Sequence, residues 1–177
     1  MSNPALNVID IKVTVKPQWL LESSMVQVIF YLQDVPETLA FKRTGIEPYW
    51  QEYAWEVFIN TDNDLNTGSN APSEFPWTGS DYSLSAHSFI NPQYQKGNFP
   101  IEKGVQVGVG LISGNTTTPL SQGYINVDPE ANTITIWGTV PGVTTDSKFS
   151  FSVFDANPDG QIENAFGQIT DRVSFIE

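Results

Sequence analysis

The chain has 177 residues, no cysteine, and a formal net charge of −12 from 20 acidic and 8 basic side chains. This length suits one domain that buries enough apolar surface to fold without disulfides or metal. The lack of cysteine excludes disulfides, thiolate metal sites and a cysteine nucleophile. Because so acidic a surface repels phosphate, we expect no nucleic-acid partner and regard a cation as the natural small ligand. No apolar run reaches the roughly 20 residues of a membrane span, so we expect no membrane insertion.

Alternation of apolar and polar residues is the main pattern along the chain. In Met25–Gln33 it places Val26, Val28 and Phe30 on one side and Gln27 on the other, as in a half-buried strand. Similar runs are rich in β-branched and aromatic residues, which strands prefer. They predict strands at Val8–Lys16, Met25–Gln33, Tyr53–Thr61, Tyr82–Ile90, Val105–Ser113, Gly123–Val127, Thr133–Thr139, Phe149–Phe154 and Arg172–Ile176.

Turn-forming residues separate these runs, and no stretch of ten residues has a helical period. Asp128–Asn132, between two apolar runs, reads as a hairpin turn. About nine strands at short spacing predict an all-β fold, a jelly-roll-like antiparallel sandwich of two sheets, as one domain over residues 1–177. Two long loops, Ala40–Glu52 and Asp62–Ser80, stand out because long loops on a β scaffold commonly carry binding function.

The start of the second long loop is the best candidate for a cation site. Asp62, Asp64 and Asn66 occupy alternate positions of a turn closed by Gly68. Calcium takes six to eight oxygen ligands, and carboxylates and amides spaced in this way can point at one centre. Asp and Asn also favour turns through local bonds between side chain and backbone, without any metal. Both interpretations stay open on the sequence alone.

A second acidic segment, Asp155–Glu163, is a weaker candidate. Asp155, Asn157 and Asp159 match the opening of an EF-hand loop, but Phe166 occupies the twelfth position, where that loop needs a bidentate Glu. The segment fits either a calcium turn on a β scaffold or a plain turn rich in helix-breaking residues. The two acidic turns could also meet at one end of a sandwich.

The run YAWEVFINTDNDLNTG, followed after a loop by GSDYSL, resembles a pattern in bacterial surface-associated β-sandwiches. These sandwiches form the broad carbohydrate-binding-module-9 and DOMON-like group. The likeness covers about Phe30 to Leu84, and more weakly FSVFDANPDG near the second acidic segment. It implies a jelly-roll sandwich with a non-catalytic and often extracellular binding role. It also implies that Asp62, Asp64 and Asp81 belong to the polar end of the sandwich.

Some DOMON-like domains bind haem and need axial ligands for it. The chain has a single histidine, His87, in the middle of an alternating run. We therefore interpret His87 as a packed or surface residue and do not expect haem.

Aromatic residues in the two long loops offer faces on which sugars could stack. Tyr49 and Trp50 lie in the first loop and Trp77 lies in the second. The alternative is that they pin the loops onto the sandwich. Trp55 and Trp137 fall within strands and are predicted to be core residues.

Nothing in the sequence indicates catalysis. It contains neither a Gly-x-Ser-x-Gly elbow nor a phosphate-binding loop, and His87 has no obvious nucleophile beside it. Glu52 and Glu56 share one strand face, about 13 Å apart at strand spacing, which is too far for most glycosidase pairs.

The sequence therefore predicts a non-enzymatic, calcium-binding sandwich module for carbohydrate or another cell-surface ligand. The resemblance implies a location outside the cell or on its surface, and a cytoplasmic location is the alternative. A structural or adhesive domain of a larger surface protein, without a small ligand, is the alternative. A sandwich-fold glycoside hydrolase is the third possibility. The sequence predicts no oligomeric state.

Overall fold

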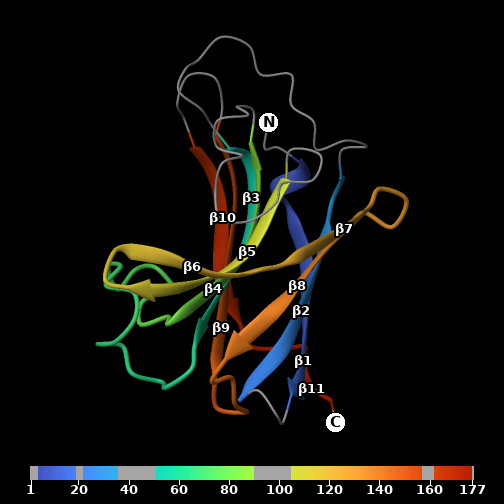
Figure 1. Ribbon diagram of the computed structural model, residues 1–177. Coiled ribbons are helices and arrows are strands. Elements are labelled where there is room, and N and C mark those ends of the chain that lie inside the picture. Colours follow the sequence, from blue (N-terminus) through green and yellow to red (C-terminus); the bar gives the residue numbers. More distant parts are fainter. Residues whose placement is uncertain (1–3, 19–21, 36–50, 90–104, 157–161, 177) are drawn as a thin grey trace.

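Two β-sheets make up the part of the chain that the computed structural model describes, which is residues 4–18, 22–35, 51–89, 105–156 and 162–176 (Figure 1). The helical structure within these ranges is one 3-10 turn, η1 (Pro4–Leu6). No helix there is long and apolar enough to cross a membrane. The predicted all-β class is confirmed.

The first sheet has five strands in the order β11-β1-β2-β8-β7. Their bounds are β1 Val8–Gln18, β2 Ser23–Leu32, β7 Tyr124–Asp128, β8 Thr133–Pro141 and β11 Val173–Phe175. Neighbours are antiparallel except β1 and β11, which pair in parallel with Val13 opposite Val173. The prediction of purely antiparallel sheets is wrong at this edge. The predicted hairpin turn between β7 and β8 is confirmed, with Asp128 opposite Thr133.

The second sheet has six strands in the order β10-β9-β3-β4-β5-β6, and all neighbours are antiparallel. Their bounds are β3 Gln51–Asn60, β4 Tyr82–Phe89, β5 Val105–Ser113, β6 Thr116–Gln122, β9 Lys148–Ala156 and β10 Ile162–Ile169. Eleven strands in the described ranges replace the predicted nine, because β6 and β10 were not predicted. Both are edge strands, and β6 (TTTPLSQ) lacks alternation because it is almost wholly exposed.

The inner faces of the two sheets share one hydrophobic core. Val26, Val28 and Phe30 of β2 are fully buried, as their alternation predicted, and so is Trp55 of β3. The prediction that Trp137 is a core residue is wrong. It lies on the outer face of the first sheet, between the buried Ile136 and Gly138, and its ring stacks on that of Tyr124 at 5.7 Å.

Candidate binding face

The acidic turn after β3 is closed by its own hydrogen bonds. The Asp62 carboxylate accepts from the backbone N–H of Asp64 at 2.9 Å and from the Thr67 hydroxyl at 2.9 Å. The Asp64 carboxylate accepts from both the backbone N–H and the side-chain amide of Asn66 at 2.8 Å. The backbone bond from Asn66 is the main cause that lowers the pKa of Asp64 below 3.8. These local donors offset the repulsion between the two carboxylates.

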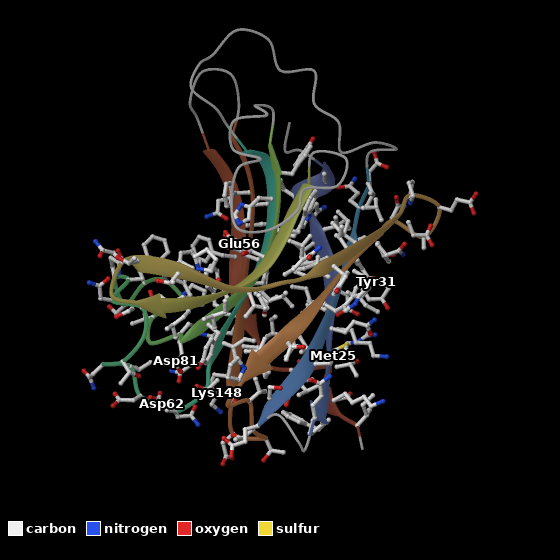
Figure 2. All side chains as sticks on the ribbon, viewed as in Figure 1. Met25, Tyr31, Glu56, Asp62, Asp81 and Lys148 are labelled. Atoms are coloured by element: carbon white, nitrogen blue, oxygen red, sulfur yellow. The ribbon has the colours of Figure 1, made fainter. Side chains whose placement is uncertain are left out.

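Gly68 and Asp81 fix the two ends of this loop. Gly68 has φ +60°, so the expectation that a glycine lets the turn curl back is confirmed. Asp81, just before β4, accepts from the backbone N–H and the hydroxyl of Thr61, both at 2.8 Å. Its carboxylate therefore ties the end of the loop to its beginning. Figure 2 shows Asp62 and Asp81 at the same end of the molecule as Lys148.

The hydrogen bonds that close this turn do not by themselves make it a calcium site. Within the described ranges, no three His, Asp or Glu side chains converge as a metal-ligating group. The carboxylates of Asp62 and Asp64 are exposed, and Asp64 uses only Oδ1 in its bonds to Asn66. A calcium ion here would draw on these two carboxylates, the Asn66 amide oxygen and backbone carbonyls. The predicted site stays a prediction.

Strands occupy both ends of the second acidic segment. β9 continues to Ala156 and β10 begins at Ile162, so the predicted turn over Asp155–Glu163 is too long. In the register of β3 with β9, Asp155 lies opposite Tyr53, whereas Lys148 lies opposite Asn60. The two acidic segments therefore sit at opposite ends of β3, and the idea that they meet is wrong. Asn157 and Asp159 lie outside the described residues, and so do Tyr49 and Trp50.

Trp77 is the centre of four aromatic rings on the outer face of the second sheet. Its ring lies 5.2 Å from Phe58 of β3, 4.8 Å from Phe75 of the same loop and 5.5 Å from Phe166 of β10. We call these four residues the aromatic cluster. The cluster pins the loop to the sheet, yet all four rings are partly exposed and Phe166 is 44% exposed.

A pocket of about 270 Å³ adjoins the aromatic cluster at the end nearer the acidic turn. Gln168 of β10 donates a hydrogen bond to the carbonyl of Pro76 in the loop at 3.2 Å, and both residues line the pocket. Polar and apolar groups both line it, from Asn60, Asn63, Leu65, Pro76, Thr78, Ser80, Lys148, Phe149, Ser150 and Gln168. Polar groups beside partly exposed rings are the combination that small-molecule sites use.

Glu56 of β3 and His87 of β4 lie on the same outer face, with Glu56 Oε2 and His87 Nε2 3.6 Å apart. Their side chains are only 16% and 23% exposed. Burial raises the pKa of Glu56 from 4.5 to about 7 and lowers the pKa of His87 from 6.5 to about 4. Near pH 6 the pair therefore carries one proton and no net charge.

Sequence reasoning missed this pair. Glu56 was considered only as a partner for Glu52, whose side chain lies outside the described residues. The available signal was that Glu56 is the one ionisable residue in the run AWEVFIN, at a position that alternation assigns to the outer face. The partner could not be found in this way, because it depends on the register that sets His87 opposite Ala54.

Comparisons with protein-family models, with curated proteins and with solved structures found no match for this chain.

Proposed function

We propose that this chain is a non-catalytic carbohydrate-binding module with a jelly-roll-like sandwich fold. Its binding face is the outer face of the second sheet together with the loop between β3 and β4. The observation that supports this proposal is the partly exposed aromatic cluster, which lies between the pocket and the Glu56–His87 pair. Carbohydrate polymers of cell walls and surfaces lie outside the cytoplasm, so the proposal includes an extracellular or cell-surface location.

The chemistry of this face suits a sugar better than an apolar ligand. Sugar rings stack their C–H faces on aromatic rings, and their hydroxyl groups bond to polar groups at the ring edges. Phe166 offers the most exposed ring of the cluster, and the exposed polar side chain of Gln168 lies two positions along β10 on the same face. A negatively charged ligand would be disfavoured by the net charge of −12.

Replacing Phe166 by alanine should weaken polysaccharide binding by about tenfold, because the loss of one stacking ring removes about 1.4 kcal/mol. Affinity gel electrophoresis in xyloglucan, galactomannan and mixed-linkage β-glucan measures this as lost retardation. Trp77→Ala should lose at least as much, since Trp77 contacts the other three rings of the cluster.

Tyr124→Ala is the matched control, because Tyr124 is also an exposed, stacked ring but lies on the opposite sheet. Equal retardation of wild type, Phe166→Ala and Trp77→Ala would contradict the proposed face. A chain that none of the polysaccharides retards would favour the structural or adhesive alternative. Hydrolysis of a polysaccharide that disappears in Glu56→Gln would favour the glycoside hydrolase.

We propose calcium as a second ligand, because the exposed carboxylates of Asp62 and Asp64 begin the loop that carries Phe75 and Trp77. A calcium concentration of about 100 times the dissociation constant should add about 2.7 kcal/mol to the free energy of unfolding. Thermal melts in calcium and in chelator should then differ by several degrees. Asp62→Asn with Asp64→Asn should abolish the difference, and an unchanged wild-type midpoint would contradict calcium binding.

A further inference from the structure

Glu56 and His87 come from β3 and β4, which are neighbours at the centre of the second sheet. Ala54 lies opposite His87 and Glu56 lies opposite Ser85, so the pair is a diagonal contact between the two strands. Figure 2 shows Glu56 far from the end of the molecule that holds Asp62 and Lys148. The pair is therefore separate from the acidic turn and needs an explanation of its own.

Small side chains lie on both sides of Glu56 in its row of the sheet. In the registers of β3 with its two neighbours, Ser152 of β9 lies on one side and Ser85 of β4 on the other. Gly108 of β5 lies beyond Ser85, and Phe166 of β10 lies beyond Ser152. The row across the sheet thus holds a carboxyl group flanked by serines, with a ring of the aromatic cluster at its β10 end.

Aromatic rings also bound the pair on the His87 side, where the ring of Phe154 meets the imidazole edge-on at 6.4 Å. No lysine, arginine or further carboxylate lies in the described rows on either side of Glu56. Lys148 of β9 lies opposite Asn60, four positions along β3 from Glu56. In the described rows the pair is thus bounded by small polar and aromatic side chains.

Burying a carboxyl group and an imidazole disfavours folding unless a partner compensates for their lost hydration. Ionisable groups held in this way are concentrated at functional sites. A carboxyl and an imidazole that share one proton can each donate or accept a hydrogen bond, as neighbouring sugar hydroxyls do.

We propose that Glu56 and His87 form the hydrogen-bonding subsite for adjacent hydroxyl groups of an uncharged saccharide that stacks on the aromatic cluster. This inference rests on the proposed function and names its ligand class. Uronic and sialic acid polymers are disfavoured, because their carboxylates would face Glu56 on a chain that carries a net charge of −12.

The single histidine of the chain makes the test direct, because the imidazole nitrogen signals in an NMR spectrum can only be those of His87. A xyloglucan, galactomannan or β-glucan oligosaccharide that matches a retarding polysaccharide should shift these signals at saturation. Glu56→Gln, which keeps the shape of the side chain, should weaken binding at least tenfold. Polygalacturonate should not bind.

His87→Gln is a second variant that should weaken binding, and Gln27→Ala, on the exposed face of the other sheet, is the control that should not. The subsite is wrong if an oligosaccharide binds and loses affinity in Phe166→Ala, yet leaves the His87 signals in place and binds Glu56→Gln within twofold. That result would not contradict the proposed function. If no neutral saccharide binds at all, both the proposed function and the subsite are wrong.

Discussion

Relative to wild type, Glu56→Gln should gain about 3 kcal/mol in its free energy of unfolding as the pH rises from 4.5 to 7. The folded pKa of Glu56 is raised to about 7 from 4.5. Its stabilising contribution is therefore complete below pH 4.5 and is lost as the pH rises through 7. The variant does not lose this contribution, so its free energy of unfolding rises relative to that of the wild type across that range.

His87→Gln should behave in the opposite way. The folded pKa of His87 is lowered to about 4 from 6.5, so the contribution of the neutral imidazole is present above pH 6.5 and is lost as the pH falls through 4. Relative to wild type, the variant should lose about 3 kcal/mol as the pH rises from 4 to 6.5. In the wild type the two effects cancel between pH 4.5 and 6.5, because the pair binds one proton in both the folded and the unfolded chain.

Urea unfolding of the three proteins at pH steps between 4 and 8 measures these differences. Subtracting the wild type removes the contribution of the other acidic residues, of which the sequence has many. Ser85 and Ser152, which lie opposite Glu56 on β4 and β9, do not titrate in this range. Differences that do not change with pH would show that burial shifts neither pKa.

Gly68→Ala should destabilise the fold by about 3 kcal/mol, since it combines backbone strain with a clash against backbone atoms. Gly68 has φ +60°, and an added Cβ would lie 2.2 Å from the carbonyl oxygen of Ser80. That oxygen accepts a 2.8 Å hydrogen bond from Ser69, which closes the base of the loop. The substitution should therefore also weaken polysaccharide binding, because the same loop carries Phe75 and Trp77.

Gly114→Ala separates the effect of backbone strain from the effect of the steric clash. Gly114 has φ +64°, but the nearest atom to an added Cβ is 3.8 Å away. This variant should lose only about 1 kcal/mol, the cost of the left-handed conformation alone. Urea unfolding of both variants measures the difference, and equal losses would show that the contact with Ser80 does not constrain the loop.

The sequence predicts the fold best where a strand has one buried face. β2 follows its alternation because Val26, Val28 and Phe30 face the core. β6 could not be predicted in this way, since an exposed edge strand has no apolar side and Pro119 suggests a break. The parallel pairing of β1 with β11 follows from tertiary packing that no local pattern records.

The candidate binding face could be predicted only in part. Trp77 was identified from its place in a long loop, and Gly68 from its position after the acidic turn. The cluster around Trp77 needs Phe166 from β10, a strand that the sequence did not indicate. Glu56 and His87 meet because of the register between β3 and β4, which neither strand specifies alone.

The pairing of central strands also determines when this chain can fold. Phe30 of β2 lies opposite Ile134 of β8, and Trp55 of β3 lies opposite Val153 of β9. These partners are about a hundred positions apart, and such non-local pairing makes all-β proteins fold in milliseconds to seconds rather than microseconds. During synthesis, the hairpin of β1 with β2 and the pair of β3 with β4 can form early. Each sheet nevertheless keeps an unpaired central edge until the ribosome has made β8 and β9, so the core between the sheets cannot be completed before β9 emerges.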